Sequence, residues 1–494
     1  MYSNNFVRLF SVMILLASVT SRAQAPANAT EVQELRKQLD EMRKQMGAME
    51  SKIEALESST ANAAVAPAPA APVVPQEASI QTAQPLAPGP VSRDVGEQTR
   101  SYQTFSENPL AAARMDNVPL DPKYRGYFVL PGTRTMLKIG GYFKTDFIYD
   151  LKPAGDPEQF IPSSIPIPAP QGVNNETVSV RPTRLTLDFL IPNSKVGNVR
   201  FYLEGDFFGT NATTPRLRHA YGQAKNFLIG QTFTNFMDPD AFPDTLDFAG
   251  PNALVNLRNP QFNYGFPLGK STTLHISVER PSSDIAFTTP AFTAQPNSPS
   301  PDGVIRIRRE FPAGHLQAAV LLRSDSASIG TGANTRTDSV FGWGVSATTG
   351  FRTFGKDNTI LQGTYGNGIA RYIPDTSGLG VDAAVISTAA PRLRATPEVA
   401  FAGAYQHYWA NSVRSSVAYG FVQIENTDAQ QANTFHKSDY SAANLIWNPG
   451  GSLNLGAEFL YGWQILKNGQ TGNAPRIQFS AKYNFVNLGP APKK

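Results

Sequence analysis

Short segments in which apolar and charged residues alternate recur through most of the chain, and they limit its possible folds more than any other feature. The stretch GVIRIRREF, residues 303–311, is one of them. It places Ile305 and Ile307 on one face of a strand and Arg306 and Arg308 on the other, because successive strand side chains point to opposite faces. A soluble barrel would turn the isoleucines inward, whereas a membrane barrel would turn the arginines into its lumen.

Sixteen such segments lie between Thr135 and Phe485, and each is about as long as a membrane-crossing strand requires. Their approximate ranges are 135–149, 179–191, 197–208, 214–224, 226–233, 257–266, 270–279, 302–311, 314–324, 339–349, 358–369, 396–408, 412–425, 436–448, 451–464 and 475–485. An even number of strands is typical of single-chain bacterial barrels. The sequence therefore predicts an all-β fold, a 16-stranded antiparallel transmembrane β-barrel over residues 135–485, with its apolar faces toward lipid.

The connections between these segments alternate in length, with one short exception near residues 209–213. Tight turns occupy residues 192–197, 267–269, 312–313, 410–412 and 448–451. Longer connections occupy residues 150–178, 234–256, 280–301, 325–338, 370–395, 426–435 and 465–474. Short periplasmic turns and long external loops are typical of an outer-membrane barrel. A secreted soluble β-protein, the rival interpretation, has no reason to sort its loops by end.

The first 25 residues are typical of a secretory signal peptide. Arg8 precedes an apolar stretch at residues 9–19, and the small residues of AQA follow at 23–25. The apolar stretch is too short for a membrane anchor. We therefore expect the mature protein to leave the cytoplasm.

Residues 26–57 contain a strict heptad repeat of apolar residues. Its seam consists of Val32, Leu35, Leu39, Met42, Met46, Met49, Ile53 and Leu56. The repeat favours a parallel coiled coil over a lone amphipathic helix, which would drift off this register. We therefore expect a periplasmic coiled coil and an oligomer, with two and three strands both open. The remaining regions are an Ala/Pro-rich spacer at 58–92, where proximity to peptidoglycan is possible, a pre-barrel segment at 93–134 and a tail at 486–494.

The composition argues against several classes of function. The chain has no cysteine, which removes disulfides, thiolate zinc sites and thiol catalysis. Its formal net charge of +4 is too small to indicate a nucleic-acid surface. The five histidines are scattered, with no zinc-protease, nucleophile-elbow, P-loop or dinucleotide motif. We expect no enzyme, no cofactor or metal, and no nucleic-acid partner.

The alternation assigns more basic than acidic residues to the lumen. The basic set is Lys138, Lys144, Arg184, Arg200, Arg216, Arg218, Arg306, Arg308, Arg323, Arg414, Arg476 and Lys482, and the acidic set is Asp146, Asp188, Glu204, Asp206, Glu279, Glu310, Glu398 and Glu458. Arginine stays charged and its planar fork matches carboxylate and phosphate, so basic rings favour anions in a pore. The alternative is that many of these charges are paired scaffolding, such as Arg184 with Asp188 and Arg308 with Glu310 within single strands.

Two arginine pairs are the sharpest candidates for anion contact, because each places its arginines two residues apart on one face. These are Arg216 with Arg218 and Arg306 with Arg308. Further pore-lining candidates are Arg184, Arg200, Arg323, Arg414 and Lys144.

Residues 234–252, TNFMDPDAFPDTLDFAGPN, form a proline-rich acidic loop. It contains Asp238, Asp240, Asp244 and Asp247. Such a loop can fold into the lumen and face the basic wall, which would make a narrow constriction with a transverse field. A calcium site is one rival, since Asp238 and Asp240 have the spacing of calcium loops, although the glycine and later glutamate of an EF-hand are missing. A plain external loop is the other rival.

Two stretches resemble the DcaP-type outer-membrane porins. They are residues 108–150, NPLAAARMDNVPLDPKYRGYFVLPGTRTMLKIGGYFKTDFIYD, and residues 229–252, IGQTFTNFMDPDAFPDTLDFAGPN. The resemblance implies a homotrimer of sixteen-stranded barrels with periplasmic N-terminal helices, set among outer-membrane lipid and lipopolysaccharide. It also implies uptake of anions such as dicarboxylic and aromatic acids. Two departures from the family are the tail after Phe485, where a terminal aromatic residue is usual, and the long first loop with PSSIPIPAPQG at 162–172.

The sequence thus supports three functional hypotheses for a barrel protein. The first is a porin that passes small anions through an arginine-lined pore. The second is a general diffusion porin whose charges are structural. The third is an envelope tether in which the barrel is only an anchor, although sixteen strands are wide enough for an aqueous channel.

Overall fold

The structure is a computed structural model that describes residues 126–210, 214–288, 293–330, 335–386, 392–450 and 452–486. The chain divides into two units, residues 1–83 and 84–494, and the described residues all belong to the second. The predicted signal peptide, coiled coil with its seam, and Ala/Pro-rich spacer lie outside the described residues. So do most of the pre-barrel segment and of the tail, and these assignments stay predictions.

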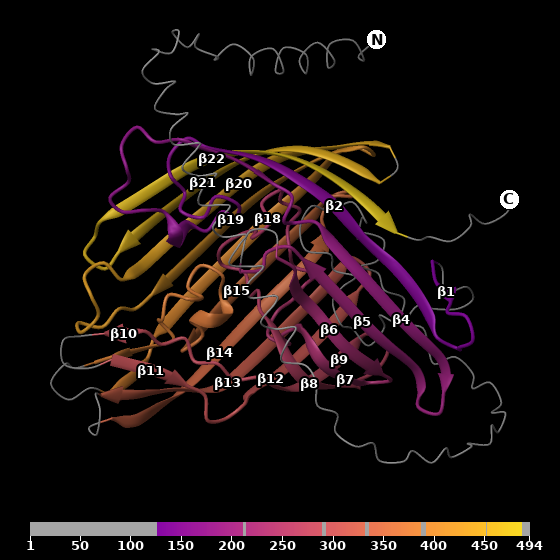
Figure 1. Cartoon of the computed structure of the whole chain (residues 1–494), viewed down its shortest axis with the longest axis horizontal. Coiled ribbons are helices and arrows are strands. Elements are labelled where there is room, and N and C mark those ends of the chain that lie inside the picture. The colour runs from indigo at the N-terminus through magenta and orange to yellow at the C-terminus, as the bar shows by residue number, and fades with distance from the viewer. Residues whose placement is uncertain are drawn as a thin grey trace, which may run out of the picture. The chain divides into compact units, whose positions relative to one another are not determined.

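Sixteen described strands pair in chain order into a closed antiparallel barrel, as the alternation predicted. β22 pairs with β2 from Gly140↔Val486 to Asp150↔Arg476 and closes the ring, and Figure 1 shows these first and last wall strands side by side. The wall strands are β2 (Met136–Asp150), β4 (Arg184–Ser194), β5 (Gly197–Asp206), β6 (Arg216–Ala224), β7 (Phe227–Phe233), β8 (Arg258–Pro267), β9 (Thr272–Glu279), β12 (Asp302–Phe311), β13 (Gly314–Gly330), β14 (Arg336–Arg352), β15 (Asn358–Asn367), β18 (Pro397–Ala410), β19 (Val413–Ile424), β20 (Phe435–Gly450), β21 (Leu453–Leu466) and β22 (Thr471–Val486).

Short elements inside the connections were not predicted, because they are too brief to show a period. β1 pairs with the start of β2, β3 pairs with its end, and β11 pairs with β13. β16 and β17 form a separate hairpin. These elements are β1 (Phe128–Val129), β3 (Asn175–Ser179), β10 (Phe287–Thr288), β11 (Thr293–Asn297), β16 (Ala383–Val385), β17 (Leu393–Ala395) and the 3₁₀ turns η2 (Pro162–Ser164) and η4 (Ala370–Tyr372).

The exposure of the side chains shows that the charged or polar face of the wall strands, and not the apolar face, points into the barrel. On β12, Ile305 and Ile307 are 46% and 44% exposed on the outer surface, whereas Arg306 is 8% exposed and faces the interior. The same division holds around the ring: large apolar side chains are exposed outside, and arginines such as Arg184 and Arg218 are buried inside. The apolar belt is the surface that a lipid-facing barrel requires.

Two predicted long connections are wrong. Strand pairing continues to Ile329↔Arg336 between β13 and β14, and to Ile465↔Thr471 between β21 and β22. Most of the predicted loops at 325–338 and 465–474 is therefore strand. These extensions are rich in polar residues, and backbone hydrogen bonding sustains a strand without the apolar alternation that revealed the rest.

The longer connections lie at one end of the barrel, which we call the long-loop end, and the tight turns lie at the other.

The connection between β7 and β8, residues 234–257, folds into the interior, and we call it the inner segment. Its Phe236 and Met237 are fully buried in an apolar cluster with Tyr372 and Ile373 from the connection between β15 and β18. Within the described part of the chain, no helix has the length and apolarity needed to span a bilayer.

Candidate functional site in the barrel lumen

One end of the inner segment is bound to three neighbouring wall strands through Asp238. Its Oδ1 accepts from Nη1 of Arg308 on β12 at 2.9 Å. Its Oδ2 lies 2.7 Å from Nε2 of His315 on β13 and accepts from Oγ1 of Thr348 on β14 at 2.6 Å. Burial alone would raise the pKa of Asp238, but His315 and Arg308 hold it well below its usual range. Asp238 is therefore an ionised anchor.

Arg308 contacts three carboxylates. In addition to Asp238, its Nη2 lies 2.7 Å from Oδ2 of Asp240, and its Nε donates to Oε1 of Glu310 at 2.6 Å. The pairing of Arg308 with Glu310 within one strand was predicted and is confirmed. Asp238 and Asp240 are the two carboxylates of the predicted calcium site, and both bind the guanidinium of Arg308 instead. Among the described residues, no group of three or more potential metal ligands is present.

The middle of the inner segment reaches the other side of the ring through Asp244 and Leu246. Nε of Arg414 on β19 donates to Oδ2 of Asp244 at 2.7 Å. Nζ of Lys144 on β2 donates to the carbonyl of Leu246 at 2.7 Å, and Gln478 on β22 donates to the same carbonyl at 3.1 Å. The segment therefore spans the lumen from β12–β14 to β19–β2, with Arg308 and Arg414 near its two anchors.

Asp247 binds backbone groups on two segments. It accepts from the N–H groups of Phe160 and Gly250, each at 3.0 Å, and its own N–H donates to Glu458 at 2.7 Å. Burial raises the pKa of Asp247 to about 6, although Arg476 and the Phe160 N–H oppose this shift. Asp247 therefore keeps its proton to a higher pH than an ordinary aspartate does.

A second group of arginines stacks on two phenylalanines. Phe208, which follows β5, and Phe248 of the inner segment are stacked with centroids 4.5 Å apart. The guanidinium of Arg216 lies 5.3 Å from the Phe208 ring, and that of Arg218 lies 5.5 Å from the Phe248 ring. Arg184 covers Phe248 at 5.3 Å, as Arg181 covers Phe208 at 4.7 Å. We call these four arginines the guanidinium row.

Acidic residues on β5 and in the first long connection neutralise part of the guanidinium row. Asp206 accepts from Arg216 at 2.7 Å and from Arg218 at 2.9 Å. Glu204 accepts from Arg218 at 2.8 Å and lies 3.5 Å from Arg184. Glu158 forms an ion pair with Arg181. Four guanidiniums thus share three carboxylates in the described part of the chain. The side chain of Arg216 is 34% exposed. Among the predicted anion contacts that form described ion pairs, it is the most exposed.

The predicted pairing of Arg184 with Asp188 is wrong. Arg200 on β5 binds Asp188 through two hydrogen bonds, Nε–Oδ1 at 2.8 Å and Nη2–Oδ2 at 2.9 Å. Residues four apart on a strand are separated by about 13 Å, whereas the antiparallel neighbour lies across a single strand spacing. Arg200 is buried in this pair, so it has a structural role in the wall.

Arg323 on β13 is likewise enclosed by acidic groups. Its guanidinium lies 3.0 Å from Asp325, 3.1 Å from Asp382 and 3.7 Å from Asp302. It also donates to the carbonyls of Gly368 and Ser282. We call it the Arg323 hub, because it binds two long connections to the wall.

The structure brings the predicted site residues together in separate groups. Arg184, Arg216 and Arg218 share the guanidinium row. Arg306 and Arg308 both lie on β12, where Arg308 binds Asp238 and Asp240 of the inner segment. Five residues that complete these groups were not predicted from the sequence: Arg181, Phe208, Phe248, His315 and Thr348. No period marks them, because each is placed by strand register or by the path of a loop.

Comparisons with known proteins agree with this architecture. A profile of the DcaP outer membrane protein family matches residues 129–485. The crystal structure of the outer membrane channel DcaP of Acinetobacter baumannii is similar to the chain, with 23% identity, a TM-score of 0.63, and coverage of 72% of this chain and 99% of that one. In-vitro folded OmpT of Vibrio cholerae, an outer membrane protein, has 12% identity and a TM-score of 0.46 over 72% and 99% of the two chains. No curated protein sequence matches.

Proposed function

The chain belongs to the DcaP outer membrane protein family and has the fold of an outer-membrane porin, and we propose that it passes small anionic solutes by passive diffusion. Dicarboxylic and aromatic acids are the solutes that the guanidinium row suits. Its flat, charged forks match carboxylates in two-point contacts, and the phenylalanines between them offer faces for apolar groups.

The observation that carries this proposal is the composition of the guanidinium row. Arg181 and Arg216 flank Phe208 at the long-loop end, near the start of β4 and the end of β5. Arg184 lies three residues after Arg181, and Arg218 lies two residues after Arg216. Among the described residues, four guanidiniums lie there beside three carboxylates, and this concentration of arginine forks at the rim favours an entering carboxylate. Basic residues arranged along a pore favour anions.

We further propose that the inner segment narrows the pore, because it crosses the lumen between Arg308 and Arg414. The long-loop end would then face the exterior, and the tight turns and the N-terminal region would lie in the periplasm. The heptad seam at residues 26–57 supports a homotrimer joined by its coiled coil, with the outer apolar belt in lipid and lipopolysaccharide around the rim.

General diffusion is the second candidate function, and the ion pairs favour it. Arg200, Arg323 and Arg414 are buried against carboxylates, so their charges are largely compensated. A lumen neutralised in this way would conduct without strong preference for anions.

The deciding experiment is the reversal potential of the purified protein in a planar bilayer under a KCl gradient. The wild type is compared with Arg216→Gln, with the fourfold alanine variant of Arg216, Arg218, Arg306 and Arg308, and with Arg309→Gln as the matched control on the outer face. We expect an anion-selective potential that weakens in the first two variants and is kept in the control. An unselective wild type would establish general diffusion, and a protein without conductance would leave only the envelope tether.

A further inference from the structure

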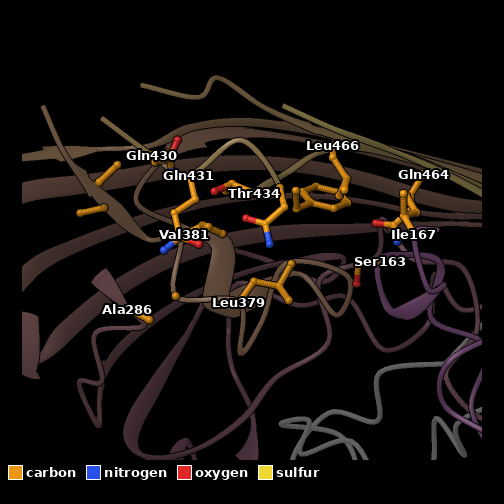
Figure 2. A pocket seen from close by; sticks show the side chains of 15 residues that line it. Ser163, Ile167, Ala286, Leu379, Val381, Gln430, Gln431, Thr434, Gln464 and Leu466 are labelled. Atoms are coloured by element: carbon orange, nitrogen blue, oxygen red, sulfur yellow. The ribbon is translucent and has the colours of Figure 1, made fainter. Parts of the chain in front are cut away.

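A cavity of about 510 Å³ lies among the long connections (Figure 2). Its walls come from the first long connection, from Ala286, from residues 379–381 and 383–384, from residues 430–431 and 433–435, and from the end of β21. Figure 2 shows Gln430 and Gln431 at one end, Gln464 and Ile167 at the other, and Leu379 and Ser163 along one side. Its volume falls within the range of small-molecule sites. We call it the amide pocket.

The lining of the amide pocket differs in kind from the lining of the lumen. None of its fifteen described lining residues is Asp, Glu, Lys, Arg or His. The polar groups are side-chain amides and hydroxyls, from Gln430, Gln431, Asn433, Gln464, Ser163 and Thr434. An anion entering it would lose its water without gaining a cationic partner, which is costly, whereas an uncharged solute gains hydrogen bonds.

Gln464 provides an unsatisfied acceptor in the wall of this pocket. The residue is 3% exposed, and its Nε2 donates to the carbonyl of Ile165, which sets the direction of the amide. Its Oε1 is buried and has no hydrogen-bond partner among the residues that the structure describes. A buried acceptor without a donor is unfavourable, so the position suits a donor from a bound molecule.

Gln430, at the opposite end, presents the complementary group. Its Oε1 accepts from Nδ2 of Asn426 at 3.2 Å and from the N–H of Thr427 at 2.9 Å. Because its oxygen already takes two bonds, its Nε2 is the group that it offers to the pocket. The pocket therefore has an acceptor at one end and a donor at the other.

Apolar side chains form the remaining surfaces. Ile167, Leu379 and Leu466 line the pocket between its two amide ends. Val381 and Phe435 also line it, and both belong to the buried cluster that contains Phe236 of the inner segment. Because Val381 and Phe435 are 3% and 5% exposed, the floor of the pocket is an apolar surface continuous with the buried cluster.

We propose that the amide pocket binds an uncharged solute of roughly disaccharide size that has hydrogen-bond donors and an apolar face. Its donors would reach Gln464 Oε1, its acceptors would reach Gln430, and its apolar face would lie on Leu379 and Leu466. The channel mouth would then recognise a neutral ligand that the arginine-lined lumen does not select. This inference does not depend on the anion selectivity of the pore.

The test is isothermal titration calorimetry of the detergent-solubilised full-length protein with N,N′-diacetylchitobiose, an uncharged disaccharide with hydroxyl, amide and methyl groups. We expect saturable binding to the wild type. Gln464→Leu should weaken the affinity by about tenfold or more, because it removes the acceptor. Gln470→Leu is the matched control, since Gln470 is an exposed glutamine in the adjoining turn that does not line the pocket.

A second variant separates binding from local folding, because Gln464 also holds Ile165 in place. Leu379→Trp fills the pocket from an exposed loop position and leaves the hydrogen bonds of Gln464 intact, so it should abolish binding while heat-modifiable gel mobility stays as in the wild type. Absence of binding to the wild type would overturn the proposal, as would unchanged affinity in both variants. Binding of succinate that Leu379→Trp abolishes would overturn the assignment to uncharged ligands.

Discussion

The guanidinium of Arg308 lies 2.9 Å from Oδ1 of Asp238, seventy residues away in the chain, and this contact joins the inner segment to the barrel wall. The carboxylate of Asp238 is fully buried, and the arginine is 11% exposed. A residue that the sequence suggests as a contact for anions therefore also anchors the segment that we propose as the constriction. The proposal thus links selectivity and pore width at this position.

Replacing Arg308 should loosen the inner segment. In Arg308→Gln, Asp238 keeps His315 and Thr348 but loses its guanidinium, and removal of one partner from a buried ion pair typically costs about 3–5 kcal/mol. We expect a higher single-channel conductance and a lower unfolding temperature. Arg309→Gln changes the neighbouring arginine on the outer face and should alter neither. An unchanged conductance in Arg308→Gln would show that the inner segment does not limit the pore.

Asp247 should make stability depend on pH between about pH 4 and pH 6. Its pKa is raised from the ordinary 3.8 to about 6 in the folded protein, so over this interval the folded state holds a proton that the unfolded state has released. The free energy of unfolding therefore falls as pH rises through the interval, by about 3 kcal/mol from this group.

The measurement for Asp247 is the difference in thermal unfolding between wild type and Asp247→Asn at several pH values from about 4 to 7. Titrating groups far from Asp247 contribute equally to both proteins, so the difference reports Asp247 together with Glu458, which accepts a hydrogen bond from its N–H. The wild type should lose stability relative to the variant as pH rises, and the difference should level off above about pH 6. Parallel profiles would mean that Asp247 does not titrate in this range.

The Arg323 hub should contribute much more to stability than an exposed ion pair does. Arg323→Met leaves Asp302, Asp325 and Asp382 buried together without their common cation, and we expect a loss of about 3–5 kcal/mol. Arg394→Met removes an exposed pair with Glu425 and should cost less than about 1 kcal/mol. Chemical denaturation of both variants in detergent measures the contrast, and equal losses would contradict the assignment of the hub.

Gly141 should not tolerate a side chain. Its φ is +133°, and a Cβ at this position would lie 2.1 Å from the carbonyl oxygen of Arg184 on the paired strand β4. Gly141→Ala should therefore disturb the pairing of β2 with β4 and cost about 2 kcal/mol or more. Gly363→Ala places its Cβ in open space and serves as the control. The fraction of folded, heat-modifiable protein after refolding measures the effect, and equal yields would exclude strain at Gly141.

The strands and the orientation of their faces could be predicted from the sequence, because both are local properties. β12 begins and ends where the alternation of residues 302–311 predicted, since each side chain on a strand points opposite to the last whatever the strand pairs with. The polar ends of β13 and β14 were not predicted, because the two-residue period can be recognised only where apolar and polar residues alternate. The backbone hydrogen bonds between the two strands continue there all the same.

The partners of the lumen charges depended on the tertiary structure alone. The alternation showed that Arg184, Asp188 and Arg308 face inward, but strand register decided that Asp188 binds Arg200, and the path of the inner segment brought Asp238 to Arg308. The amide pocket likewise draws its walls from several loops, and no single stretch of sequence contains it. Side-chain direction follows from the residue's own backbone, whereas an ion pair or a cavity requires two distant segments to arrive at one place.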